Sequence, residues 1–487
     1  MSFAERSPSA ASDLPRFTRE GAGGDPPPID SEWLLTNGTG SFGMGTATGC
    51  NTRRYHGLLI AATDPPVGRI NTLNAINETL SFDGRPHDLA THAFAGGDGQ
   101  VAYHPEGWKH LQTLAKDLAV EWSYRVGPVA LRKTLRLIHG RQLAAIDYLV
   151  ELSGAGHAPA PDRVTLALQP LASMRDFHSL RQAYAGDPMH VEVRGGEATL
   201  ASPPLPALHL AMNVGRFTAE QDWWHHFHYH HEAERQLDCT EALFAPCRWT
   251  HTFDPHQPLR VTLAFGVEPI DWSAIHAPDW RRPHLRPHID HVDRQLPEPC
   301  DAVTALTVAC DDFVVARSVK GEPSTTIIAG YPWFSDWGRD TMIALPGCLL
   351  TTGRFDEARR TLLTFAAHVS DGLVPNRFDD YGGDPHYNTV DASLWFVHAA
   401  IEYIKASDDA ATWQFQLGPA CLEIIDSYAR GTRFDIGADR DGLIAAGSPD
   451  TQLTWMDAAR DGVVFTPRWG KAVEINALWY SALRGCA

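Results

Sequence analysis

The sequence lacks any run of about 18 apolar residues, which is the length that a membrane-spanning helix needs. Residues 1–30 are rich in Ser, Ala, Pro and Gly and have no apolar block of the kind found in secretion signals, so we expect a disordered leader. The eight cysteines form no CxxC pair, which favours free thiols in a reducing cytoplasm. We therefore expect a cytoplasmic protein that does not bind a membrane.

Positive charge is also scarce, since 41 Lys and Arg residues face 59 Asp and Glu residues and leave a formal net charge of −18. A chain this acidic is a poor candidate for binding nucleic acid or anionic lipid. It fits a neutral ligand. The length of 487 residues predicts two or more domains.

Residues 31–270 carry a β pattern in which apolar and polar residues alternate. The clearest runs are Val129–Leu137, Ile146–Leu152, Val164–Leu168 and Leu259–Phe265. Turn residues separate these runs. Many strands with polar alternation predict an antiparallel β-sandwich.

The pattern changes after residue 270. Residues 271–297 show little periodicity and predict a linker, whereas residues 298–487 have a helical period. Short loops join the helical segments, which predicts a run of helical hairpins. The helical segments expected after the first one lie at about 340–352, 355–370, 388–406, 411–430 and 472–484.

Three motifs suggest ligands but also have plainer interpretations. Gly38–Gly43 matches GxGxxG, yet no acidic residue follows until Asp64, so tight turns at a sheet edge or a loop reaching a neighbouring cleft fit better than a nucleotide site. Adjacent histidines in Trp223–His231 point to different faces, which favours a surface or interface segment over a metal site. The acidic stretch at residues 435–442 fits a turn better than a calcium loop. We expect no metal and no cofactor.

Two stretches combine Trp with Asp, namely Gly330–Asp340 and Gln452–Asp457. A sugar has apolar C–H faces and a rim of hydroxyls, so flat rings, forked donors and carboxylates suit it. A carboxylic acid beside an indole can also have a raised pKa, which suits it to protonate a glycosidic oxygen. These stretches predict an enzyme that cuts glycosidic bonds.

Loops at one end of a barrel of helical hairpins converge on one mouth, so we expect Arg339, Asp340 and Asp457 to share a sugar cleft. Each tryptophan can equally be a core residue, which is the usual place of aromatics on helices. The further substrate-binding candidates are Trp333, Trp337, Asn376, Arg377, Asp391, Trp395, Gln452, Trp455, Lys471 and Glu474.

The sequence resembles the bacterial and archaeal glycogen-debranching enzymes, the amylo-α-1,6-glucosidase family. The resemblance is dense over residues 32–60 and 328–481 and thin over residues 85–215. The matching stretches are Trp33–Gly38, Thr52–Leu59, Tyr331–Asp340, Gly372–Phe378, Tyr387–Phe396, Gln452–Ala458 and Lys471–Tyr480.

The resemblance implies an N-terminal β-sandwich followed by an (α/α)6 barrel that hydrolyses the α-1,6-linked glucose at the branches of glycogen or limit dextrin. It implies that Asp457 is the general acid and that Arg339 and Asp340 grip the hydroxyls of the terminal glucose. It also implies inversion, in which a second carboxylate roughly 6.5–9.5 Å away activates water.

In the family that second carboxylate lies beyond the position of Ala487, so we expect a C-terminally truncated sequence whose residues 298–487 form the first half of an incomplete barrel. Glu474 is the nearest internal substitute, although the resemblance makes it a substrate-binding residue. Ala459 stands where the family tends to have Lys, and Pro449-Asp450 where Gly is usual, which bears on substrate preference. Two alternatives remain open: another α-glucosidase of glucoamylase or trehalase type, and a glucan-binding fragment without catalysis.

Overall fold

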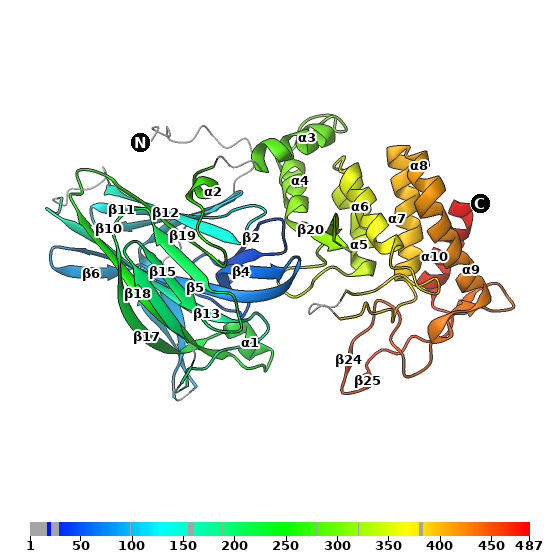
Figure 1. The fold of residues 1–487 in the computed structure, drawn as a ribbon, viewed down its shortest axis with the longest axis horizontal. Helices are drawn as coiled ribbons and strands as arrows, with labels where there is room; N and C mark the ends of the chain where they lie inside the picture. Colours follow the sequence, from blue (N-terminus) through cyan, green and yellow to red (C-terminus); the bar gives the residue numbers. More distant parts are fainter. Residues whose placement is uncertain are drawn as a thin grey trace. The chain divides into compact units, whose positions relative to one another are not determined.

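The computed structural model describes residues 17–20, 29–97, 99–153, 160–184, 186–187, 189–277, 281–319, 321–378 and 383–487. The chain divides into two compact units whose boundary lies between helices α2 and α3 (Figure 1). The first unit is rich in antiparallel sheet and the second is helical, as the sequence predicts. Among the described residues, no helix is both long and apolar enough to cross a membrane.

The predicted leader is only partly described. Phe17–Glu20 forms strand β1, which pairs with strand β9, so the expectation of disorder is wrong for these four residues. Except for residues 29 and 30, the rest of the leader lies outside the described residues.

The first unit contains two large antiparallel sheets. Across the nine-stranded sheet the described strands are β1 (Phe17–Glu20), β9 (Leu111–Lys116), β10 (Val120–Val126), β11 (Val129–Leu137), β12 (Leu143–Leu152), β19 (Leu259–Gly266), β16 (Leu208–Met212), β15 (Glu197–Ala201) and β14 (His190–Arg194). Across the ten-stranded sheet they are β2 (Glu32–Thr36), β3 (Phe42–Thr46), β4 (Gly57–Asp64), β5 (Val67–Phe82), β13 (Val164–Asp176), β18 (Thr240–Phe253), β17 (Phe217–His228), β7 (Thr91–Ala95) and β8 (Val101–Glu106), with β6 (Arg85–Asp88) beside β5. Short helices η1 (Gly107–Lys109), α1 (His230–Glu234) and α2 (Trp272–His276) join strands or follow them.

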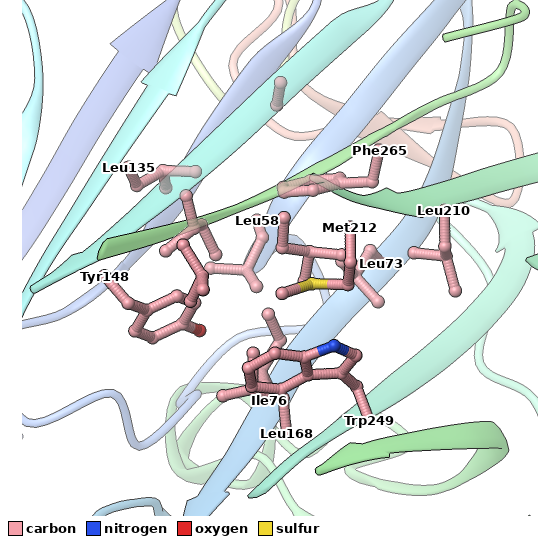
Figure 2. Packing of buried hydrophobic residues seen from close by; sticks show 14 of the residues in the cluster. Leu58, Leu73, Ile76, Leu135, Tyr148, Leu168, Leu210, Met212, Trp249 and Phe265 are labelled. Carbon is pink, nitrogen blue, oxygen red and sulfur yellow. The ribbon is translucent and has the colours of Figure 1, made fainter. Parts of the chain in front are cut away.

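Both sheets contribute to one buried apolar cluster (Figure 2). Leu58 and Leu168 come from the ten-stranded sheet, and Leu135 and Phe265 from the nine-stranded one. The four alternating runs of the sequence correspond to β11, β12, β13 and β19, so these strand predictions are confirmed. The alternation of apolar and polar residues identifies these strands because successive side chains of a strand point to opposite faces of the sheet, and one face is buried.

The GxGxxG stretch covers most of the turn between β2 and β3 and the first two residues of β3. Gly38 has φ 75° and Gly40 has φ 85°, which L side chains rarely adopt. Strand β3 follows at Phe42 where a nucleotide-binding loop would lead into a helix. This is the tight turn that the sequence favours.

The second unit packs its helices around a separate apolar cluster that includes Leu345, Leu362, Phe396, Ile424 and Trp479. Its described elements are α3 (Arg281–Asp293), α4 (Asp301–Phe313), β20 (Val314–Val319), β21 (Glu322–Ile327), α5 (Gly338–Leu345), η2 (Pro346–Leu350), α6 (Phe355–Ala366), α7 (Ala392–Ser407), α8 (Ala410–Thr412), η3 (Trp413–Leu417), α9 (Gly418–Arg430), η4 (Arg433–Asp435), β22 (Gly437–Ala438), β23 (Ile444–Ala445), β24 (Ala459–Arg460), β25 (Val463–Val464) and α10 (Val473–Cys486).

Two features of the chain after residue 270 differ from the sequence expectation. The predicted linker 271–297 contains helices α2 and α3. Helix α3 buries Leu285, Ile289 and Val292 on one face, and Pro283 and Pro287 obscure that pattern in the sequence. The hairpin of β20 and β21 was also not expected between helices.

Candidate active site

Helix α5 presents Arg339 from its first turn, and a glycine makes this placement feasible. The N–H of Gly338 donates to the carbonyl oxygen of Asn376 at 2.8 Å. A Cβ on Gly338 would lie 2.1 Å from the carbonyl oxygen of Pro375. Only glycine therefore lets this chain segment cross the start of α5 so closely, and the crossing fixes Asn376 beside the helix that carries Arg339.

Arg339 joins two carboxylates that are distant in the sequence. Its Nε donates to Oδ2 of Asp391 at 2.8 Å, and its Nη1 donates to Oδ2 of Asp457 at 3.1 Å. Asp391 immediately precedes α7, is 2% exposed and also accepts the hydroxyl of Thr389 at 2.7 Å. The Asp457 side chain is 27% exposed. The buried guanidinium of Arg339 thus holds the buried carboxylate of Asp391 and the partly exposed carboxylate of Asp457 in a single cluster.

Two buried polar atoms around Arg339 lack a hydrogen-bond partner among the described residues. Nη2 of Arg339 and Oδ1 of Asn376 find no hydrogen-bond partner among the residues that the structure describes. Buried donors and acceptors are nearly always bonded, because an unmade bond costs about 1–3 kcal/mol. A ligand that carries hydroxyl groups suits this place, because a hydroxyl can accept a hydrogen bond from the free donor and donate one to the free acceptor.

Asp340 follows Arg339 in the first turn of α5, inside the helix and not at its N-cap, which is Trp337. Its side chain is exposed, yet enough protein surrounds the carboxyl that partial burial raises its pKa. The guanidinium of Arg339 opposes this rise in pKa, while Asp457 and Asp391 add to it. These three groups therefore lie within electrostatic range of Asp340.

Arg468 is a site residue that the sequence analysis missed. It donates to both carboxylate oxygens of Glu474, with Nη2 to Oε2 at 2.8 Å, and its Nη1 reaches Oγ1 of Thr454 at 3.4 Å. This contact with Arg468 lowers the pKa of Glu474. The pair ties the loop that carries Asp457 to the start of α10. The sequence offers no signal for this role, because no spacing rule joins an arginine to a carboxylate six positions later.

Exposed aromatic rings lie in the same loop. Trp455, two residues before Asp457, is 57% exposed, and Phe465 and Trp469, which the sequence analysis also missed, are similarly open. Such rings in a loop offer flat apolar surfaces to the C–H face of a sugar. On the other stretch, half-buried Trp337 has the guanidinium of Arg377 6.0 Å from its ring centre.

Three other candidates give weaker structural support. Trp395 is half-buried on α7 and packs against the helical core, which agrees with the core alternative for this residue. Trp333 and Gln452 are also half-buried. Their role in substrate binding stays a prediction.

Lys471 belongs to a different set of contacts. Its ammonium pairs with Asp439 at 2.8 Å and with Asp441 at 2.7 Å. Both carboxylates lie in the turn between β22 and β23, where Gly442 has φ 81°. The acidic stretch is thus a turn held by a lysine, and the structure does not bring Lys471 to the carboxylate cluster.

In the part of the chain that the structure describes, no predicted site residue belongs to a cluster of potential metal ligands. Within the described ranges, the group of three His, Cys, Asp or Glu ligand atoms that gather within 4.8 Å consists of His284, His288 and Glu357. The histidines of residues 223–231 do not form such a group there, although His230 and His231 both pair with Glu234.

Comparison with known families and proteins agrees with the two-unit organisation. Residues 31–260 match the family described as "Glycogen debranching enzyme N terminal", and residues 308–487 match the family described as "Amylo-alpha-1,6-glucosidase". The "Glycogen debranching enzyme" of Saccharomyces cerevisiae is 34% identical over 225 residues, covering 34% of this chain and 15% of that protein.

Two solved structures serve for comparison. A putative kojibiose phosphorylase from the human microbiome superposes with a TM-score of 0.51 at 11% identity, over 97% of this chain and 65% of that one. A bacterial glucoamylase complexed with acarbose has a TM-score of 0.44 at 12% identity, over 89% and 64% of the two chains. The chain thus spans less than two thirds of each of these relatives. Since the two family matches together cover most of it, the chain belongs to the glycogen-debranching-enzyme family.

Proposed function

We propose that the helical unit is a glycosidase domain that releases α-1,6-linked glucose from a branched glucan such as glycogen or limit dextrin. The observation that carries this proposal is the Arg339 cluster, in which one buried guanidinium bonds Asp391 and Asp457 and keeps a third nitrogen open. Membership of the debranching family supports a glucan as the substrate. The acidic net charge of −18 agrees with a neutral ligand.

The residues divide into three roles. Asp457 is the general acid, because it is the more open of the two carboxylates that Arg339 holds and lies two residues from exposed Trp455. Arg339 and Asp340 hold the hydroxyls of the terminal glucose, through Nη2 of the arginine and the carboxylate beside it. Asp391 is a positioning residue, since it is buried against Arg339.

The reaction we propose is inversion. Asp457 gives its proton to the glycosidic oxygen as the bond from that oxygen to glucose C1 breaks. Water attacks C1 from the opposite face and gives its proton to a second carboxylate, roughly 6.5–9.5 Å from the acid. Glu474 fits this second role poorly, because Arg468 occupies both of its oxygens and lowers its pKa.

The fold we propose is a β-sandwich built from the two sheets, followed by part of an (α/α)6 barrel. The common apolar cluster of the two sheets supports the first part. The run of helices α4 to α10 around one core supports the second. The likeness of fold to the kojibiose phosphorylase is in line with this arrangement.

The test measures glucose released from branched limit dextrin by the wild-type protein, the Asp457→Asn variant and the matched Asp461→Asn variant. Asp461 lies in the same loop with its side chain 90% exposed and has φ 52°, which asparagine tolerates well. We expect Asp457→Asn to lower the release rate at least 100-fold while dextrin binding persists, because general acid catalysis contributes about 10²–10⁴. Asp461→Asn should release glucose at the wild-type rate.

Equal turnover by the Asp457→Asn and wild-type proteins would refute the assignment of the acid. Parallel assays on maltose and trehalose separate the proposal from an α-glucosidase of another preference. Dextrin binding by the wild-type protein with no glucose release would favour a binding function without catalysis. Failure of the wild-type protein to bind dextrin would remove both functions.

A further inference from the structure

A group of three potential metal ligands lies in the helical unit, outside the carboxylate cluster. His284 and His288 are four residues apart on α3, so they lie on the same face of that helix. Glu357 belongs to the first turn of α6. One ligand atom from each of the three lies within 4.8 Å of the others, and all three side chains are half-buried.

The face of α3 that carries these histidines packs against the chain that leads into α6. Nδ1 of His288 lies 3.0 Å from the carbonyl oxygen of Thr352. One turn further on, the ring of His291 packs edge-to-face with Phe355 at 6.1 Å. The two helical segments are therefore held beside one another by contacts that a metal ion would reinforce.

The contact of His288 determines which of its nitrogens can bind a metal. A carbonyl oxygen only accepts, so Nδ1 carries the proton and donates it to Thr352. This leaves the lone pair of Nε2 available as a ligand. A ring N–H bonded to a backbone carbonyl is the arrangement that metal-binding histidines generally use to fix their orientation.

Charged groups of both signs surround the three ligands. Arg354 lies 3.8 Å from Glu357, but its guanidinium also pairs with Asp311 at 3.0 Å. Arg281 pairs with the same aspartate at 2.7 Å and with Asp312 at 3.1 Å. Three carboxylates thus stand against two guanidinium groups, so a divalent cation adds to a neighbourhood that is slightly negative.

We propose that His284, His288 and Glu357 bind a divalent transition metal, with zinc as the best match. Two imidazoles and one carboxylate suit zinc and exclude calcium or magnesium as the preferred ion. Zinc–ligand bonds of about 2.0–2.1 Å bring tetrahedral ligand atoms to about 3.3 Å from one another. Half-buried side chains reach this spacing by shifts of roughly 1 Å, and water takes the fourth position.

The ion cross-links α3 to the first turn of α6. Because it binds the folded protein in preference to the unfolded chain, it should raise the melting temperature, with a stabilisation that grows as the logarithm of its concentration relative to the dissociation constant. The site contains none of the residues proposed for sugar binding or catalysis, so its test is independent of glycosidase activity.

The experiment uses the whole chain, stripped with a chelator and titrated with zinc against a chromophoric competitor. The variants are His284→Ala and Glu357→Gln, both at half-buried positions, and the control is His398→Ala on α7. All four proteins keep the histidines of residues 225–231, so weak binding there is common to all. Cobalt titration of the same proteins reports tetrahedral coordination through its visible absorption.

We expect the wild-type protein and His398→Ala to bind one tight equivalent of zinc, and each variant to bind it about 100-fold more weakly or not at all. Zinc should raise the melting temperature of the first two proteins only. The proposal is overturned when the wild-type protein binds no tight equivalent. It is also overturned when both folded variants bind zinc as tightly as the wild-type protein.

Discussion

At the scale of single residues, Arg339 determines what the candidate site can do. It is 7% exposed and bonds two carboxylates through two different nitrogens. A planar guanidinium can make such a fork and still offer Nη2 to a ligand, whereas an ammonium has a single point of charge. The sequence identified Arg339 and both of its partners, but it gave no means of knowing that Asp391 pairs with the arginine while Asp457 stays partly open.

Replacing Arg339 with lysine should therefore weaken both binding and folding. We expect at least tenfold weaker binding of limit dextrin and a loss of about 1–3 kcal/mol of stability, because one carboxylate remains buried without its partner. Calorimetric titration and thermal melting measure the two effects. Arg360→Lys, at an exposed position on α6, is the matched control and should change neither. Wild-type affinity in the Arg339→Lys variant would remove the arginine from the site.

A second residue network stabilises the first unit through Glu32. The amide of Thr52 donates to Nδ1 of His56, so Nε2 carries the proton and donates to Glu32 at 3.0 Å. Arg53 adds a bond of 2.7 Å. Burial opposes the charged form, yet the bonds from His56 and Arg53 prevail and hold the pKa of Glu32 at about 2.

This network predicts a pH-dependent effect of Glu32→Gln. A carboxylate whose pKa is lowered from 4.5 to about 2 contributes stability that is complete above pH 4.5 and is lost as the pH falls towards 2. We expect the variant to be less stable by on the order of 2 kcal/mol at pH 7, and the difference to shrink as the pH falls below 4.5.

Melting curves from pH 7 to pH 3 measure this difference. Glu220→Gln is the matched control, because Glu220 also pairs with an arginine but on an exposed surface, where ion pairs contribute about 0–1 kcal/mol. A difference between wild type and Glu32→Gln that stays constant across this range would contradict the assignment.

At the scale of elements, the start of α5 is the tightest crossing near the site. The segment that holds Asn376 runs so close to Gly338 that any side chain there meets the carbonyl of Pro375. Helix propensity alone would favour alanine over glycine at this position. The glycine is therefore explained by the crossing and not by the helix.

Gly338→Ala should lower stability by about 1–3 kcal/mol and weaken dextrin binding, because the backbone must shift and Arg339 moves with it. Gly347→Ala is the matched control: it also lies in a helical segment, but nothing stands within 4 Å of an added Cβ. It should raise stability by up to about 1 kcal/mol. Thermal melting and calorimetric titration of both variants check this pair, and equal effects of the two substitutions would contradict it.

The elements that the sequence predicted are those with a strong and uninterrupted period. Strands β11, β12, β13 and β19 alternate clearly, and α6, α7 and α9 show a helical period. Helix α3 was missed because its prolines suggest a connector, although a proline in the first turn costs a helix nothing and Pro287 is accommodated. Arg468 was missed because its role depends on Glu474 and Thr454, which no spacing rule joins to it.

At the scale of the whole molecule, two apolar cores are built by two different periodicities. The first unit buries its cluster between sheets and the second around helices. The whole chain has a formal net charge of −18. The expectation that it does not bind nucleic acid rests on this charge and stays a prediction. The hydrogen bond between Arg339 and Asp457 depends on the fold of the chain, because the two residues lie 118 positions apart in the sequence.

The most direct measurement is a crystal structure of the Asp457→Asn variant soaked with an α-1,6-glucosylated maltooligosaccharide. We predict a glucosyl unit whose hydroxyls lie about 2.7–3.2 Å from Nη2 of Arg339 and from Asp340, with residue 457 beside the glycosidic oxygen. A sugar bound on another surface, or an ordered site that stays without sugar at saturating concentration, would contradict the account.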